Sequence, residues 1–285
     1  MTAINKIAFS LFILWAWHAQ ASCPSDLQAA ALAARYANLQ PAPNLPADMT
    51  MVDVLCGRDK YVHFLPQVAG KVVGYKLSLT NPAIQKRFDH PEPIRGTLFE
   101  TMLLRGDAEV PAKFGVWPMY EADMVVEVAD EGINQAKTPL EALRHLSRIY
   151  PFIELPDLMT DNPAKVSGLS LTLTNMAARL GVLGEPLAVT ATPELVAALE
   201  NMTVRFTDLD GKVLENNPGN VLLGNPLNSV LWLVKDLNAA GIRLKSGDLL
   251  SLGSFSQPYP AKPGIGARLT YDGLPGNPTV SVRFK

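Results

Sequence analysis

Two kinds of hydrophobic pattern divide the chain. Between Asp26 and Ala37 apolar residues recur at helical spacing, and Thr50 with Asp53 marks the beginning of another helix. From residue 71 onward, apolar residues alternate with polar ones or form short runs between Pro- and Gly-rich turns, which is typical of strands. The predicted strands lie at residues 72–79, 119–128, 202–207 and 280–284, and a further strand begins at Leu249.

Two helices interrupt the predicted strands. Thr138 and Pro139 begin a helix that we expect to run to about Ile149, with the proline at a position where a missing N–H is harmless. A second helix follows Asn225 and has its apolar residues on one face. The pattern predicts a small helical N-terminal region, residues 22–70, followed by one strand-dominated domain, residues 71–285. The strand order does not follow from it.

The first 21 residues have the three parts of a secretory signal. Lys6 precedes an apolar run at residues 7–17, and the small residues Ala19 and Ala21 flank Gln20 at the expected cleavage site. The run is too short for a permanent membrane span. We therefore expect signal removal after Ala21 and a periplasmic or secreted protein, with no stable membrane span left. The alternatives are a membrane-tethered tail and a lipoprotein modified at Cys23; lipidation is less favoured, because Gln20 stands where lipoprotein sites prefer a Leu-like residue.

Composition narrows the class of protein. Apolar residues make up 48% of the chain and charged residues 18%, as in a packed globular protein. The 25 basic and 27 acidic side chains give a net charge of −2, which gives no reason to expect a nucleic-acid partner. The only cysteines are Cys23 and Cys56. In an oxidising compartment they could pair; the alternative is a buried thiol at Cys56 and a free or lipidated Cys23.

Three acidic residues are candidates for a metal site. Glu121 and Asp123 are two residues apart in a predicted strand, so their side chains share a face. Such a pair repels when buried unless a cation lies between the two acids, and spacing alone favours the solvated face of an edge strand. Glu154 is a lone acid in an apolar stretch. Three carboxylates would suit Mg²⁺ or Mn²⁺, whereas the scattered histidines make no zinc site.

Other positions have two interpretations each. Lys76, in an apolar strand, is either an edge residue that reaches water or an ammonium group held for a substrate carboxylate. Gly253 and Ser254 either place backbone close to a ligand or mark a bulge, and Gly96 is typical of a turn. The chain lacks a nucleophile elbow, a Walker loop and a dinucleotide fingerprint, which excludes the commonest hydrolase, kinase and dehydrogenase classes.

Five segments, taken in order, carry a family resemblance. They are residues 74–80 (GYKLSLT), 93–99 (PIRGTLF), 120–123 (YEAD), 152–155 (FIEL) and 221–250, which contains LGNP, a helix and LKSGD. This series resembles the 2-keto-4-pentenoate hydratase and oxalocrotonate decarboxylase branch of the fumarylacetoacetate hydrolase superfamily. The similarity covers roughly residues 70–285.

The resemblance implies an α+β fold with a mixed β-sheet roll. It implies Mg²⁺ or Mn²⁺ held by Glu121, Asp123 and Glu154, and a lyase or hydratase that acts on a small 2-keto or 2-hydroxydienoic acid through a metal-stabilised enolate. Lys76 would neutralise the substrate carboxylate or assist proton transfer, and Gly253 with Ser254 would contact the substrate. Relatives are often homo-oligomers, so a homo-oligomer is expected by analogy.

The chain departs from the family pattern at three pocket positions. Ile94 stands where hydratases of this branch usually have an acidic residue, Ala177 where they have a serine, and Leu252 where they have serine or threonine. These departures keep two other functions open. One is a C–C bond hydrolase on acylpyruvate-type substrates, and the other is a non-catalytic secreted relative that binds a keto acid or a partner.

Overall fold

The computed structural model describes residues 23–285, except for the side chains of residues 82 and 83. The predicted signal peptide, residues 1–21, lies outside the described residues. Within the part that is described, none of the helices has the length and apolarity needed to cross a bilayer.

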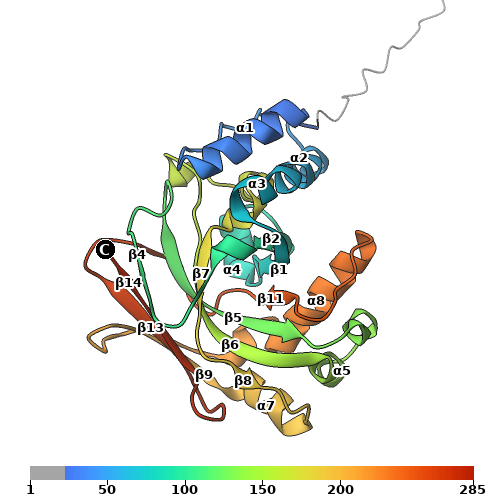
Figure 1. Ribbon diagram of the computed structural model, residues 1–285, viewed down its shortest axis with the longest axis vertical. Helices are drawn as coiled ribbons and strands as arrows, with labels where there is room; N and C mark the ends of the chain where they lie inside the picture. The colour runs from blue at the N-terminus through green and yellow to red at the C-terminus, as the bar shows by residue number, and fades with distance from the viewer. Residues whose placement is uncertain (1–22) are drawn as a thin grey trace, which may run out of the picture.

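Three helices precede the first strand and lie together at one end of the molecule (Figure 1). They are α1 (Asp26–Ala37), α2 (Met51–Phe64) and α3 (Pro66–Ala69). Ser25 and Thr50 cap α1 and α2 with reciprocal side-chain bonds, which satisfies backbone N–H groups that each helix start leaves free. These helices share a hydrophobic cluster with residues of the body, including Phe99 and Met102. A domain boundary at residue 70 stays a prediction.

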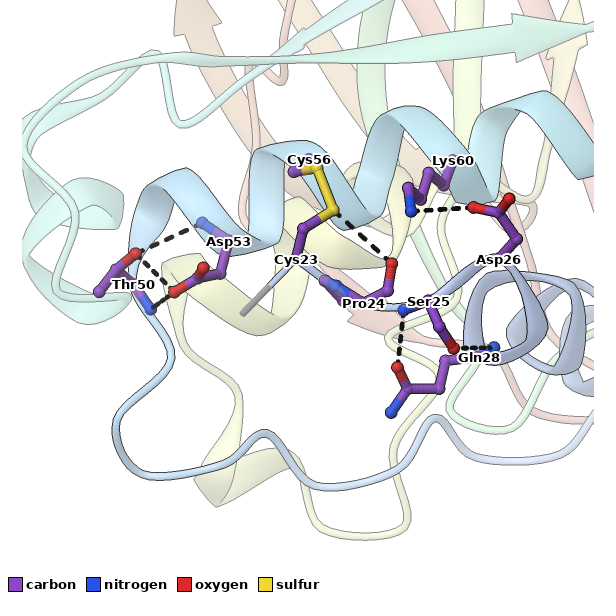
Figure 2. The surroundings of a disulfide bond; sticks show 9 residues. All are labelled: Cys23, Pro24, Ser25, Asp26, Gln28, Thr50, Asp53, Cys56 and Lys60. Carbon is purple, nitrogen blue, oxygen red and sulfur yellow. Dashed lines mark hydrogen bonds and ion pairs between the residues drawn. A yellow bond between two sulfur atoms is a disulfide. The ribbon is translucent and has the colours of Figure 1, made fainter. Parts of the chain in front are cut away.

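A disulfide ties the segment before α1 to α2. Cys23 and Cys56 are bonded, with their Cα atoms 5.6 Å apart, and Figure 2 shows the bond beside the two helix caps. An ion pair between Lys60 and Asp26, at 2.8 Å, joins the same two helices. Of the two alternatives that the sequence left open, a disulfide or unpaired cysteines, the structure has the disulfide. The described residues contain no free cysteine.

The larger sheet has nine strands and mixed pairing. Its strand order is β2-β1-β11-β5-β6-β7-β3, with β12 paired to β5 and β8 paired to β6. The strands are β1 (Val72–Ser78), β2 (Ile94–Phe99), β3 (Leu103–Arg105), β5 (Met119–Val128), β6 (Leu146–Leu155), β7 (Leu180–Leu183), β8 (Leu187–Ala188), β11 (Leu249–Ser251) and β12 (Tyr259–Pro260). β5 and β6 lie in its middle, so residues on them are covered by neighbouring strands on both sides.

A second sheet of five strands packs against the first. Its order is β10-β9-β13-β14-β4, and β13 and β14 contact β6. The strands are β4 (Ala108–Val110), β9 (Thr203–Asp208), β10 (Val213–Pro218), β13 (Gly266–Asp272) and β14 (Thr279–Phe284). Rings of Tyr120, Phe206 and Phe284 meet where the sheets face each other. The main hydrophobic core lies here.

The remaining helices surround the sheets. They are α4 (Pro82–Arg87), α5 (Pro139–Arg144), α6 (Gly168–Leu173), α7 (Pro193–Asn201) and α8 (Pro226–Ala239), with short 3₁₀ turns at η1 (Glu100–Met102), η2 (Glu131–Gln135), η3 (Pro163–Lys165), η4 (Asn175–Ala177) and η5 (Gly219–Val221). The buried face of α8 carries the predicted apolar stripe. The expected α+β class with mixed sheets is confirmed.

Two local predictions were wrong. The helix expected from Pro139 to about Ile149 ends at Arg144, and residues 146–155 form β6. At the start of β6, Leu146 and Ile149 are buried, whereas Ser147 is half-buried and Arg148 is exposed, so the apolar residues recur three apart, as they do in a helix. Gly96 lies inside β2, directly opposite Lys76, and not in a turn.

Candidate metal and substrate site

The pairing of β5 with β6 brings the three predicted acids together. Glu121 lies directly opposite Glu154 in the antiparallel register, and Asp123 follows on the same face of β5. Asp123 is fully buried and Glu154 is 3% exposed, while Glu121 is half-buried. The alternative of a solvated edge strand was wrong, because β5 lies between β11 and β6. We call Glu121, Asp123 and Glu154 the acid cluster.

Lys76 places a positive charge against the acid cluster. It lies on β1, between β2 and β11, and only 2% of it is exposed. Its Nζ forms an ion pair with the Glu154 carboxylate and donates a hydrogen bond of 3.1 Å to the Met176 carbonyl. The alternative of an edge lysine that reaches water was therefore wrong.

The absence of a side chain at Gly96 makes room for this lysine. A Cβ atom at Gly96 would lie 2.8 Å from the Asn175 carbonyl oxygen and 2.9 Å from Lys76 Cγ, which is closer than real Cβ atoms approach. The small residue therefore lets the lysine stem and η4 meet over β2.

The turn η4 has an unusual backbone. Its three residues, Asn175, Met176 and Ala177, all have positive φ, between 54° and 58°. Non-glycine residues rarely adopt this conformation, and strain of this kind clusters at functional sites. The Asn175 side chain holds the turn in place, since it accepts from the Thr97 N–H at 2.7 Å and donates to the Thr97 carbonyl at 2.8 Å. This conformation of η4 points the Met176 carbonyl toward Lys76.

Three donors orient Asp123. Ser251 Oγ, on β11, donates to Asp123 Oδ2 at 2.8 Å, and the N–H groups of Met124 and Gly253 both donate to Oδ1. Gly253 has φ +107°, and a Cβ there would lie 2.7 Å from Thr80 Cγ2, so this position requires glycine. The sequence interpretation missed Ser251; the signal was a polar residue in an otherwise buried apolar strand.

The two predicted substrate contacts have other partners in the structure. Gly253 binds Asp123 through its N–H. Ser254 lines the cavity described below, but its hydroxyl lies within hydrogen-bonding distance of the Ala122 and Ser256 carbonyls, at 3.1 and 2.8 Å. Both residues organise the loop after β11, and their contact with a substrate stays a prediction.

The acid cluster carries more negative charge than Lys76 balances. Burial raises the pKa of Glu121 well above its usual range, and the neighbouring Glu154 adds to the effect. Burial, followed by the charge of Glu154, also raises the pKa of Asp123 to about 7. Both shifts arise because ionised carboxylates are held close together away from water. A divalent cation would supply the missing positive charge, and donors that are all carboxylate oxygens suit Mg²⁺ or Mn²⁺.

In the structure, the acid cluster does not form a complete metal site. Across residues 23–285, no group of three or more His, Cys, Asp or Glu side chains is arranged to hold a metal ion. The contacts give the reason, since Glu154 is engaged by Lys76 and Asp123 by Ser251. The cluster fits the ion in donor type and charge, and Glu154 would have to turn from Lys76 to meet it. Metal ligation by these acids stays a prediction.

A cavity of about 370 Å³ opens beside the acid cluster, at the small end of the range for ligand sites. Lys76 and Glu121 line it. Apolar side chains from β1, α4, α6 and η4 line one part of it, and polar side chains from β10 and from the loop after β11, among them Asn217 and Gln257, line another part. The cavity therefore has a charged end, an apolar part and a polar part.

Comparison with known proteins finds hydratases that resemble this chain. No family model matches the chain. A 2-keto-4-pentenoate hydratase of Paraburkholderia phymatum is 26% identical over 185 residues, which cover 65% of this chain and 68% of that protein. The 2-oxo-hept-4-ene-1,7-dioate hydratase of Escherichia coli is 23% identical over 250 residues, 83% of this chain and 88% of that protein. The chain is a relative of these hydratases. The family resemblance expected from the five segments is thus confirmed.

Solved structures confirm the fold. The 4-oxalocrotonate decarboxylase of Pseudomonas putida G7, complexed with magnesium and adipate, has a TM-score of 0.78 at 23% identity, over 92% of this chain and 99% of that chain. The fumarylpyruvate hydrolase of Pseudomonas aeruginosa, in complex with Mn²⁺ and pyruvate, has a TM-score of 0.55 at 12% identity, over 75% and 89% of the two chains. The curled mixed sheet is the one that the fumarylacetoacetate hydrolase resemblance implied.

The three departures from the hydratase pattern are all buried. Ile94 and Ala177 belong to one apolar cluster with Leu79 and Met176, beside the cavity. Leu252 is fully buried in the main core. Compared with the relatives' pattern, the chain therefore has apolar packing at these positions, with no polar side chain directed into the site from them.

Proposed function

We propose that the chain is a divalent-metal-dependent lyase or hydratase that acts on a small 2-keto or 2-hydroxydienoic acid. The observation that carries the proposal is a buried ammonium group, Lys76, set against three carboxylates at the end of a cavity of small-metabolite size. Relatives named hydratases and a structural neighbour named decarboxylase support an enzyme of the hydratase or lyase type. The magnesium, calcium and manganese in neighbouring structures support a divalent cofactor.

Each residue of the site has a role in this proposal. Glu121, Asp123 and Glu154 would hold Mg²⁺ or Mn²⁺, which supplies Lewis-acid polarisation of a substrate carbonyl. Lys76 neutralises the substrate carboxylate, because its ammonium group is buried and faces the cavity. Ser251 keeps Asp123 in one orientation. Lys76, Asp123 and Glu154 are buried, which strengthens the charge interactions between them.

Lys76 has a second role in the proposed reaction. Glu154 is paired with Lys76 in the structure, and when Glu154 turns to the metal the Lys76 ammonium group would be left facing the cavity, where it would assist proton transfer. This arrangement suits removal or delivery of a proton next to a carbonyl, the step that hydration and decarboxylation of 2-keto acids share.

The first test is metal binding by isothermal titration with Mn²⁺. The native protein binds Mn²⁺, and Glu121→Ala loses binding because one of three anionic donors is removed. Glu200→Ala is the matched control, since Glu200 is exposed on α7 and should not change affinity. Equal binding by the native protein and Glu121→Ala would remove the proposed metal site.

The alternative is a non-catalytic relative. Three buried apolar residues favour it, at positions where the hydratase pattern is polar: Ile94, Ala177 and Leu252. Steady turnover of a 2-keto acid that is lost in Glu154→Ala would exclude that alternative. Activity on acylpyruvates against 2-hydroxydienoates would separate a C–C bond hydrolase from a hydratase.

We also propose a periplasmic or secreted location, after removal of residues 1–21. The Cys23–Cys56 bond supports it, because disulfides persist in oxidising compartments. The same bond argues against a lipoprotein, since it uses the Cys23 sulfur that a lipid would modify. An intact mass that matches a start at Ser22 and oxidised cysteines would agree with this location; a lipidated mass would contradict it. A homo-oligomer is proposed by analogy only.

A further inference from the structure

The turn η4 lies between two residues that contact the N-terminal helices. Leu173, at the end of α6, precedes the turn, and Arg179 follows it by two residues. Because all three residues of η4 have positive φ, the turn keeps this conformation only where its surroundings hold it. The Asn175 side chain is one such restraint. The contacts of Leu173 and Arg179 show what holds the two ends.

Helix α1 holds the end that follows η4. The Arg179 guanidinium lies 4.1 Å from the centroid of the Tyr36 ring, and its Nη1 donates a hydrogen bond of 2.8 Å to the Tyr36 carbonyl. Its Nε donates to the Phe114 carbonyl at 3.0 Å. Tyr36 is a buried residue near the end of α1. Arg179 therefore joins α1 to the chain directly after the turn.

Helix α2 holds the end that precedes η4. A Cβ atom at Gly57 would lie 2.7 Å from Leu173 Cδ1 and 2.7 Å from Pro24 Cγ, so the helix meets both residues closely at this point. Met51, the first residue of α2, packs on the hydrophobic cluster that contains Met176. Helix α2 therefore contacts both α6 and η4.

Helix α2 also reaches the strand that pairs with the lysine strand. The Arg58 side chain is buried, and its Nη1 donates to the Arg95 carbonyl at 3.4 Å. Arg95 precedes Gly96, which lies opposite Lys76 in the pairing of β1 with β2. One helix therefore contacts both structures that flank Lys76, namely η4 and β2.

The disulfide joins the two helices that hold η4. Cys56 directly precedes Gly57 in α2, and Cys23 lies just before the start of α1. The helices also pack through apolar side chains and share the ion pair of Lys60 with Asp26, whose side chains are 37% and 75% exposed. Such an exposed pair contributes little. The disulfide is the one covalent link between them, because the chain has no other cysteines.

We infer that this link positions Lys76 for the substrate carboxylate, through η4 and the Met176 carbonyl. We use the name N-terminal clamp for the disulfide and its two contacts around the turn: Tyr36 with Arg179, and Gly57 with Leu173. The inference rests on the proposed function, because it assigns Lys76 to the keto-acid head. Without the disulfide, the two helices are free to shift relative to each other, η4 relaxes, and the Met176 carbonyl no longer holds the ammonium group.

The N-terminal clamp acts on one side of the site only. Glu121 and Asp123 belong to β5, whose position is set by its pairing with β6 and β11. Loss of the clamp should therefore weaken keto-acid binding and leave metal binding intact. Full affinity for the keto acid would then require an oxidising compartment, where a disulfide persists.

The test separates keto-acid binding from metal binding. Isothermal titration would measure Mn²⁺ affinity, and then the pyruvate affinity of the Mn²⁺-loaded protein, for the native protein and for the double variant Cys23→Ser, Cys56→Ser. We expect the variant to bind pyruvate at least about five-fold more weakly and to bind Mn²⁺ within about two-fold of the native affinity. Unchanged pyruvate affinity, or an equal loss of affinity for both ligands, would overturn the inference.

A second variant keeps the disulfide and weakens the contact of α2 with α6. Leu173→Val shortens the side chain that meets Gly57, and Leu173 is not part of the cavity lining. Leu233→Val, the same change at a buried leucine of the main core, is the matched control. Leu173→Val should lower pyruvate affinity at least about three-fold with Mn²⁺ affinity unchanged, whereas Leu233→Val should change neither.

The leucine pair decides the question if the cysteine variant does not fold. Equal pyruvate affinities of Leu173→Val and Leu233→Val would overturn the inference and leave the proposed function intact. If the native protein does not bind pyruvate in the presence of Mn²⁺, the proposed function itself fails and the inference falls with it.

Discussion

Asp157 and the acid cluster are both buried carboxylate sites, but their surroundings differ. Asp157, on the loop after β6, is 2% exposed and accepts hydrogen bonds from the backbone N–H groups of Val116, Trp117 and Met159, at 2.8 to 3.1 Å. A Cβ at Gly115 would lie 2.3 Å from Asp157 Cγ, so the loop can wrap the acid only with glycine there. Backbone donors satisfy this carboxylate completely, as expected of a structural residue.

The carboxylates of the acid cluster face one another. Asp123 accepts hydrogen bonds from Ser251 Oγ and from the N–H groups of Met124 and Gly253, yet its pKa is raised by burial and by Glu154, and the pKa of Glu121 is raised for the same reasons. An acid surrounded by hydrogen-bond donors stabilises the fold. In the acid cluster, three acids share a single ammonium group, and a bound cation would add the positive charge that they lack. The difference lies in the neighbouring carboxylates and not in the number of donors, and we propose that it distinguishes a metal-binding acid from a structural one.

The largest effect is expected at Asp157. Asp157→Ala leaves several buried N–H groups without an acceptor, so the free energy of unfolding should fall by about 3 to 5 kcal/mol. Urea unfolding measures it, with Asp161→Ala, an exposed acid nearby, as the control. A loss below about 1 kcal/mol would show that Asp157 does not hold this loop.

The second effect concerns the orientation of Asp123. Ser251→Ala removes the donor to Oδ2, so Mn²⁺ affinity should fall by about ten-fold, as is usual for groups that orient a metal ligand. Ser147→Ala serves as the control, because its hydroxyl bonds Glu127, away from the cluster. Unchanged Mn²⁺ affinity in Ser251→Ala would mean that Asp123 is not a ligand.

The third effect has the opposite sign to the first. Glu121→Gln removes an acid whose pKa is raised by burial and by Glu154, and such an acid destabilises the fold at pH values above its usual pKa. At pH 7 the metal-free protein should therefore become more stable by about 1 kcal/mol, even as Mn²⁺ binding is lost. Urea unfolding with a chelator present measures the change. Destabilisation comparable to that of Asp157→Ala would erase the distinction between the two sites.

The smallest effect comes from an exposed pair that serves as a reference. The Arg205 guanidinium hydrogen-bonds Asp272 and lowers its pKa below the usual 3.8. The pair is therefore stabilising above the unfolded pKa, and this stability is lost as pH falls through the lower folded value. Asp272→Asn should cost only about 0.5 kcal/mol at pH 7, and less at pH 3. An equal cost at both pH values would rule out an ionic contribution.

The sequence predicted the local part of the site. A spacing of two placed Glu121 and Asp123 on one face of a strand, because the side-chain period of a strand is local. Glu154 and Lys76 were candidates by chemistry and resemblance, but their position beside this pair depends on the β5–β6 register and on the order of β1, β11 and β5, which are long-range pairings.

Other parts could not be predicted for physical reasons. The left-handed turn η4 is held by the Asn175 side chain on Thr97, a contact between residues distant in the sequence. The start of β6 was mistaken for a helix, because the buried residues Leu146 and Ile149 are three apart, which is a helical spacing. Asp157 gave no signal, since an acid that follows a proline in a connecting segment is usually exposed.

The most direct test of the central claim is anomalous diffraction from crystals soaked with Mn²⁺ and pyruvate. The account predicts an Mn²⁺ peak coordinated by Glu121, Asp123 and Glu154, with the pyruvate carboxylate beside Lys76. A peak elsewhere, or none at the acid cluster at saturating Mn²⁺, would contradict it.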